Sequence, residues 1–119
     1  MRESIIADKS YALAVRVVRL NRHLAEKKKE FVLSKQLLRA GTSIGANVRE
    51  GQEGQSKADF VNKFSIALKE CGETLYWLDL LHDTGFLTDR QYRSICDDCI
   101  EVKKLLVSIV KTSRSRLPH

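Results

Sequence analysis

Proline is almost absent from this sequence, and glycine is scarce. The 119 residues include one proline, Pro118, and six glycines. Sheets closed into sandwiches or barrels need many tight turns, which proline and glycine usually make. Their scarcity therefore favours an all-α protein. With 43% hydrophobic and 30% charged residues, the composition is that of a globular chain, and we expect a single domain over residues 1–119.

Long apolar runs are also missing. The best candidate for a secretory or membrane segment, YALAVRVVRL, is interrupted by Arg16. The three cysteines are an odd number, and they are too few for a disulfide scaffold. We therefore expect a reduced, cytoplasmic protein with no membrane partner.

Signatures of catalytic and metal sites are lacking as well. The sequence has no glycine-rich phosphate loop, no nucleophile elbow and no paired-carboxylate pattern. Cys96 and Cys99 form one C-x-x-C, whereas a structural zinc site needs four ligands. A di-iron bundle needs two Glu-x-x-His motifs, and the nearest match is a single Asp79-x-x-His82. We expect a protein that is not an enzyme and that holds no metal or other cofactor.

Apolar residues instead recur at helical spacing in four segments. We expect helices over residues about 4–28, 33–50, 57–84 and 89–113, and a basic tail over residues 114–119. Capping boxes begin the last two helices, with Ser56 before Asp59 and Thr88 before Gln91. Because the connections are short, consecutive helices should run antiparallel, which predicts an up-down-up-down four-helix bundle.

Polar residues follow one side of the second helix and a flanking face of the third. They are Arg39, Ser43, Asn47, Glu50, Lys69, Glu70 and Glu73. We expect Arg39 to pair with Glu70 or Glu73, and Ser43 and Asn47 to bond to neighbouring amide or carbonyl groups. Lys69 should pair with Glu50. Such contacts hold the helices of one chain in register, form a subunit interface or line a ligand site, and spacing alone leaves all three open.

Two glycines lie inside the second helix, although each costs about 1 kcal/mol relative to alanine. They are Gly41 and Gly45, and the small residues Ala40 and Ala46 lie beside them. We expect these four positions to let another helix approach closely, which would offset the cost.

The third helix carries apolar residues outside its core positions. These residues are Ile66, Trp77 and Leu80. An apolar patch that contains tryptophan usually marks an interface on a small protein. The pattern therefore predicts a homo-oligomer that assembles through this patch.

The chain is basic, with a formal net charge of +6. On the first and last helices and in the basic tail, the candidate nucleic-acid-binding residues are Arg16, Arg19, Arg22, Lys103, Lys104, Lys111 and Arg114. These helices are neighbours in the expected bundle, and Arg16 and Arg19 have no carboxylate within four residues. We expect salt-sensitive contacts to phosphate groups, RNA first. Exposed lysines and arginines are, however, often only solvated. Because few aromatic residues share this face, base stacking is not expected there.

Three motifs, in order, resemble the four helix bundle proteins of the 23S rRNA-intervening-sequence family. The motifs are R-x-x-x-S-I-x-x-N-x-x-E-G, S-x-x-D-F and K-E-x-x-E-T-x-x-W-L. Their residues here are Arg39, Ser43, Ile44, Asn47, Glu50, Gly51, Ser56, Asp59, Phe60, Lys69, Glu70, Glu73, Thr74, Trp77 and Leu78. The resemblance covers nearly the whole chain.

This resemblance implies an antiparallel four-helix bundle that forms homo-oligomers, commonly ring-shaped pentamers. Some members are encoded inside intervening sequences of 23S rRNA genes. A related branch, the accessory variability determinant of diversity-generating retroelements, is a basic pentamer that associates with nucleic acid and a reverse transcriptase. We therefore expect a non-enzymatic oligomer that associates with RNA. The alternative is a structural module whose ring recruits a protein partner without binding nucleic acid.

Overall fold

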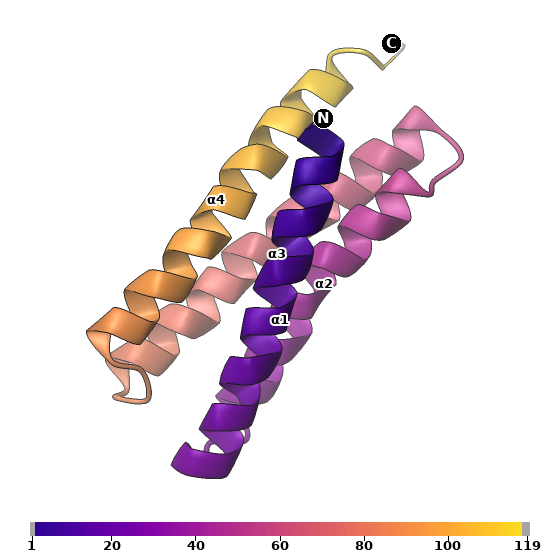
Figure 1. The fold of residues 1–119 in the computed structure, drawn as a ribbon. Helices are drawn as coiled ribbons and strands as arrows, with labels where there is room; N and C mark the ends of the chain where they lie inside the picture. Colours follow the sequence, from indigo (N-terminus) through magenta and orange to yellow (C-terminus); the bar gives the residue numbers. More distant parts are fainter. Residues whose placement is uncertain (1, 118–119) are drawn as a thin grey trace.

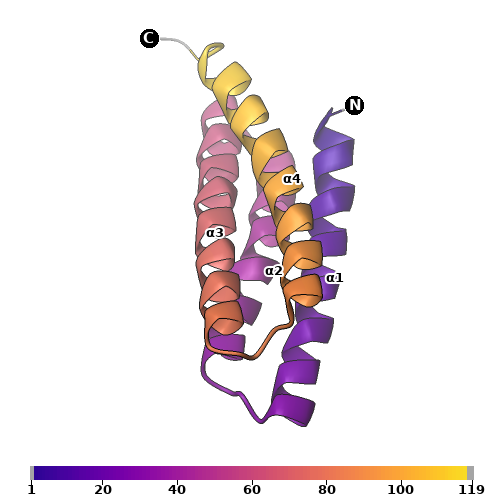
Figure 2. The ribbon, with the colours of Figure 1, turned by 90° about the vertical axis from the view of Figure 1, so that its left-hand side faces the viewer.

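The computed structural model describes residues 2–117, and these residues form four α-helices and no strand. The helices are α1 (Arg2–Lys28), α2 (Leu33–Gln52), α3 (Lys57–Asp83) and α4 (Asp89–Arg114). Figures 1 and 2 show the four helices side by side, with the chain reversing its direction at every connection. The expected all-α antiparallel four-helix bundle is confirmed, and every helix end lies within two residues of its expected position.

All four helices contribute buried apolar side chains to one core along the bundle axis. Its most buried large members are Ile6, Leu13, Leu24, Leu37, Ile44, Phe64, Leu78, Leu81, Leu106 and Ile109. Burying a side chain of this size contributes about 1.5–3 kcal/mol relative to leaving it exposed. The helical spacing of these residues therefore accounts for the fold, because each helix has one apolar side to bury.

Gly41 and Gly45 of α2 lie where α1 packs closely against it. A Cβ atom at Gly41 would lie 2.7 Å from a methyl carbon of Val17, and one at Gly45 would lie 3.3 Å from the carbonyl oxygen of Ser10. The expected close approach of another helix is therefore present, and that helix is α1 of the same chain.

Both predicted N-caps are present, as a capping box with both bonds at the start of α4 and as a bond to the Ser56 hydroxyl at the start of α3. Thr88 and Gln91 form both bonds of a capping box at the start of α4. The Oγ of Ser56 accepts a bond from the Asp59 amide at the start of α3, 3.1 Å away. Gly85 follows α3 with φ +86°, which is a conformation that glycine adopts without strain.

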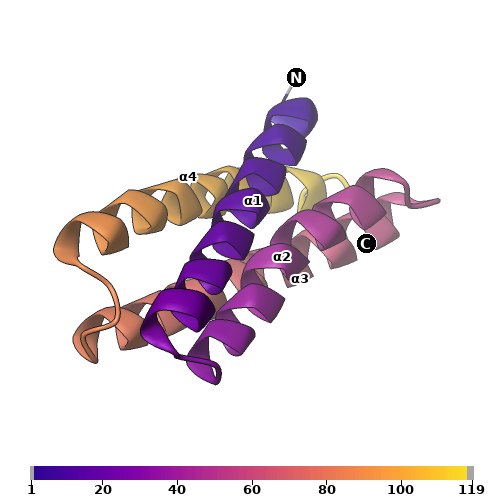
Figure 3. The ribbon, with the colours of Figure 1, turned by 60° about the horizontal axis from the view of Figure 1, so that its bottom comes forward.

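Helices α1 and α4 contact each other less than any other pair of neighbours does. Figure 3 shows α1 crossing α4 at an angle. Between them lies a groove of about 300 Å³, lined by Arg16, Arg19, Leu20, His23, Gln91 and Ile95. The pair of helices that carries the predicted basic face is therefore also the most open side of the bundle.

Candidate functional site

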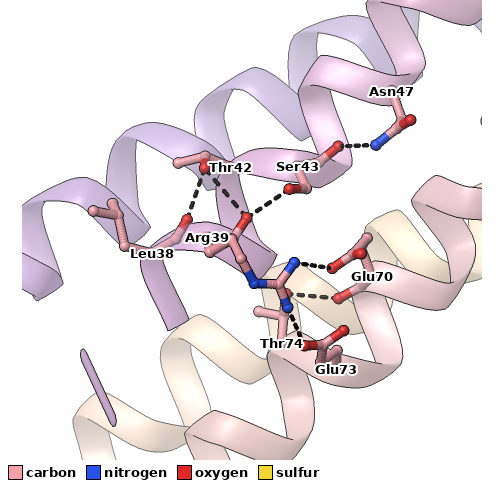
Figure 4. A network of polar contacts seen from close by, with 8 residues as sticks. All are labelled: Leu38, Arg39, Thr42, Ser43, Asn47, Glu70, Glu73 and Thr74. Carbon is pink, nitrogen blue, oxygen red and sulfur yellow. Dashed lines mark hydrogen bonds and ion pairs between the residues drawn. The ribbon is translucent and has the colours of Figure 1, made fainter. Parts of the chain in front are cut away.

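The polar residues of α2 and α3 form a network between the two helices (Figure 4). The Arg39 guanidinium forms an ion pair with Glu73 and lies 3.6 Å from the nearer carboxylate oxygen of Glu70. The predicted pairing of Arg39 is confirmed. Glu70 is only 9% exposed, so the arginine offsets the cost of a nearly buried negative charge.

Two further members of the network bond within α2. The Ser43 hydroxyl donates to the Arg39 carbonyl at 2.7 Å, and the Asn47 amide donates to the Ser43 carbonyl at 2.8 Å. Both side chains thus satisfy carbonyl groups one turn earlier in their own helix, as expected. Of the three interpretations of this polar stripe, the structure shows contacts that hold α2 and α3 of one chain together.

The predicted pair between Lys69 and Glu50 is wrong. Glu50 pairs with Lys63 instead, with 2.9 Å between the carboxylate and the ammonium group. The reason is the antiparallel register, in which advancing along α2 means moving back along α3. Arg39 is opposite Glu73, so Glu50, eleven residues further on, meets a residue ten positions before Glu73. Lys69 is exposed.

The predicted oligomer interface is more buried than the sequence suggests. Ile66, Trp77 and Leu80 are each half-buried, and Trp77 packs against the core. The indole Nε1 of Trp77 is buried and has no hydrogen-bond partner among the described residues. Trp77 follows Glu73 by one helical turn, on the side of α3 that α2 covers. The exposed large apolar residues in the described chain are Ile5, Tyr11, Phe31, Val32, Tyr76, Ile100 and Val107. Of these, Tyr76 packs edge-on against Trp77.

Arg16 has an acidic partner, contrary to the sequence-based expectation. Its guanidinium lies 2.6 Å from the Asp98 carboxylate and also donates to Ser94. Lys9, two turns earlier on α1, pairs with Glu101 at 3.0 Å. The sequence argument considered only carboxylates near Arg16 in the chain, whereas the partner comes from α4.

Most of the other predicted basic residues of α4 lie on its side toward α3. The Arg114 guanidinium donates to the Ser65 hydroxyl of α3 at 3.2 Å. Lys103 and Lys104 line a groove between α3 and α4 together with Leu75. These three residues therefore lie toward α3 rather than beside the arginines of α1. Of the predicted nucleic-acid-binding residues, those that are exposed and form no ion pair with a described residue are Arg19, Arg22, Lys104, Lys111 and Arg114.

The groove between α1 and α4 gathers groups that suit an anion. Arg19 is exposed and forms no ion pair with a described residue. The His23 Nε2 is buried and has no hydrogen-bond partner among the side chains described for residues 4–117. Gln91 belongs to the first turn of α4, where the helix dipole favours negative charge. Arg16 borders the same groove, although Asp98 already balances its charge. Sequence reasoning identified the arginines but missed His23, because only the packing of α1 against α4 buries it.

The cysteines lie in the core. Cys71, Cys96 and Cys99 are all buried. A hydrogen bond with Cys99, together with burial, raises the pKa of Cys71 far above its usual range. Burial raises the pKa of Cys96 to about 11. At neutral pH both are thiols, which are poor nucleophiles compared with thiolates. Among the side chains described, those of residues 4–117, no group of three or more His, Cys, Asp or Glu could hold a metal ion.

None of the helices described is both long and apolar enough to cross a membrane.

Comparison with known proteins identifies the family. Residues 2–108 match the family described as 23S rRNA-intervening sequence protein. The chain belongs to this family. A solved structure from Bacteroides thetaiotaomicron, described as a protein of unknown function from the S23 ribosomal protein family, is similar to this family member. The two are 55% identical with a TM-score of 0.92, over 93% of this chain and 99% of that one. A comparison with curated proteins found no match.

Proposed function

We propose that this member of the 23S rRNA-intervening-sequence family is a non-enzymatic homo-oligomer that binds the phosphate backbone of RNA. The groove between α1 and α4 carries the proposal. It brings together the unpaired charge of Arg19, the imidazole of His23 and the side chain of Gln91 in the first turn of α4. Phosphate groups bind to such combinations of cations and helix N-termini.

The rest of the charge distribution supports the same proposal. The chain has a formal net charge of +6, and the exposed Arg22 follows Arg19 by one turn of α1. Contacts of this kind release counterions, so the affinity should fall steeply as the salt concentration rises. They should also show little sequence preference, because phosphates carry no sequence information.

The test is fluorescence anisotropy of labelled RNA and DNA oligonucleotides over a range of salt concentrations, with nuclease-treated protein. Replacing both Arg19 and Arg22 by glutamine should lower the slope of log affinity against log salt by about 1.4 on single-stranded RNA. The matched control replaces Lys57 and Lys69 of α3 by glutamine, which removes the same charge from exposed positions. An unchanged slope in the arginine variant, or an equal change in the control, would refute the basic groove.

The proposed oligomer is a pentamer that assembles through Ile66, Trp77 and Leu80. Light scattering should give a mass near five times the 13.6 kDa of one chain. Leu80→Glu should shift that mass toward the monomer, since a charge in an apolar interface is costly to desolvate. A monomeric wild-type protein would refute the assembly.

A protein-interaction module is the second candidate. The groove between α3 and α4 has a volume of about 480 Å³ and is lined by Leu75, Ile100, Lys103, Lys104 and Val107. Its apolar floor and two lysines would suit an acidic, amphipathic partner helix. This candidate gains support if the wild-type oligomer binds neither RNA nor DNA at low salt.

A further inference from the structure

The connection between α1 and α2 exposes two apolar side chains at one end of the bundle. Phe31 is 60% exposed and Val32 is 72% exposed. Figure 2 shows this connection projecting beyond the one between α3 and α4 at the same end of the bundle. The exposed part of a phenylalanine ring does not contribute hydrophobic free energy to the folded monomer. Its exposure therefore suggests contact with another molecule.

Positive charge surrounds this apolar pair. The segment 27–35 contains four lysines, all exposed and none in an ion pair with a described residue: Lys27, Lys28, Lys29 and Lys35. Glu30 is the one acidic residue of the segment, and it is buried. Glu26, one residue before the segment, is exposed, so the surface near Phe31 carries four exposed lysines and one exposed carboxylate. The excess of positive charge favours an anionic occupant.

The connection is also held in a fixed shape. The Glu30 carboxylate accepts bonds from the backbone amides of Val32, Leu33 and Ser34, at 3.0, 3.0 and 2.6 Å. The Ser34 hydroxyl in turn donates to the Glu30 carbonyl at 2.8 Å. The Asn21 side-chain amide of α1 donates to the Ser34 carbonyl at 3.0 Å, which links α1 to the start of α2. Phe31 is thus presented outward by an ordered turn, so little entropy would be lost when a ligand binds to it.

We propose that Phe31 is a stacking platform for an unpaired base of single-stranded RNA, while the surrounding lysines contact the adjoining phosphates. Aromatic side chains inside a positively charged track are the usual means by which proteins bind single strands. The inference rests on the proposed RNA-binding function and adds single-stranded RNA as the substrate class.

The arrangement favours a linear polyanion over an anionic lipid surface. Arg19 and Lys27 are exposed and belong to one i, i+4 row of α1 that runs through His23 toward the tip, and Glu26 is the one exposed acidic residue beside this row. At 1.5 Å per residue, the stretch from Arg19 to Lys27 spans about 12 Å. A flexible strand can follow this length while one of its bases stacks on Phe31. A flat membrane would contact the tip alone.

The test compares Phe31→Ala, Phe31→Trp and the wild type by fluorescence anisotropy with single-stranded RNA of about 12 nucleotides. Phe31→Ala should weaken binding by roughly 5- to 100-fold without changing the salt slope, because stacking is not an ionic contact. Phe31→Trp should keep the affinity, and duplex RNA should bind all three proteins equally. The matched control is Tyr11→Ala on α1, which removes another exposed aromatic ring far from the tip and should have no effect.

Each contrary outcome has its own meaning. If the wild type binds RNA with a salt slope and Phe31→Ala binds equally well, the stacking inference is overturned while the proposed function stands. If the wild type binds no RNA, both fail. A lower oligomer mass for Phe31→Ala in light scattering would make Phe31 a subunit contact and overturn the inference. Binding to anionic vesicles that requires Phe31, without RNA binding, would overturn it in favour of a lipid surface.

Discussion

Arg16 of α1 and Asp98 of α4 form an ion pair, with 2.6 Å between the guanidinium nitrogen and the carboxylate oxygen. The two residues lie 82 positions apart in the sequence. The pair neutralises one of the three arginines predicted to bind phosphate, and the other two, Arg19 and Arg22, form no ion pair with a described residue. Acidic residues of α4 thus limit the positive charge at the edge of the groove.

Removing Asp98 should therefore strengthen RNA binding. Asp98→Asn frees the Arg16 guanidinium, so the salt slope on single-stranded RNA should rise by about 0.7. Stability should fall by less than about 1 kcal/mol, because both partners of the pair are more than a third exposed. The control, Asp97→Asn, makes the same change in net charge at an exposed position outside the pair. Equal gains in the two variants would show that net charge alone sets the affinity.

Arg39 should contribute more to stability than the other exposed cations do. Arg39→Ala removes the partner of Glu73 and leaves the nearly buried Glu70 without a compensating charge. We expect a loss of about 1–2 kcal/mol, a value discounted because half of the arginine side chain is exposed. Urea unfolding measures the difference against Lys69→Ala, which should be near neutral. Adding Glu70→Gln to Arg39→Ala should recover part of the loss, and a lack of recovery would contradict the role given to Glu70.

Two glycine substitutions should have opposite effects. Gly41→Ala places a Cβ 2.7 Å from a methyl carbon of Val17, and the β-branched valine has little freedom to move. Overpacking of this kind costs about 1–3 kcal/mol, which exceeds the gain in helix propensity. Gly72→Ala meets no atom within 4 Å and should stabilise the protein by about 1 kcal/mol. Thermal unfolding compares them, and a destabilised Gly72→Ala would reveal another subunit covering that position.

Glu30 should make stability depend on acid pH. Burial raises the pKa of this carboxyl, but hydrogen bonds from the amides of Ser34, Leu33 and Val32 outweigh burial and hold the pKa below the ordinary 4.5. The contribution is therefore fully present above about pH 4.5 and is lost as the pH falls through the lower, folded-state value.

The variant that tests this role is Glu30→Gln. It should lose about 1–2 kcal/mol at neutral pH and show a flatter decline of stability below pH 4.5. Glu26→Gln, at an exposed position of α1, should keep the wild-type pH profile. A Glu30→Gln profile that parallels the wild type would exclude the carboxylate as the titrating group.

Much of the fold follows from local patterns in the sequence. Helical spacing of apolar residues predicted the four helices and their ends, because which side of a helix must be buried depends only on neighbours three and four positions away. The capping box of Thr88 and Gln91 could also be predicted from the sequence, because its two residues are only three positions apart. Arg39 and Glu73 could be paired because short connections make α2 and α3 antiparallel neighbours.

Only the tertiary structure determines which side chains of neighbouring helices contact one another. The register of α2 against α3 places Glu50 next to Lys63 rather than Lys69. The same packing leaves Trp77 half-buried. The crossing of α1 and α4 paired Arg16 with Asp98 and buried the His23 Nε2. The turn at Glu30 holds Phe31 in solvent. Helical periodicity is a local property of the chain, whereas register and crossing arise when distant side chains pack together, and no spacing within one helix specifies them.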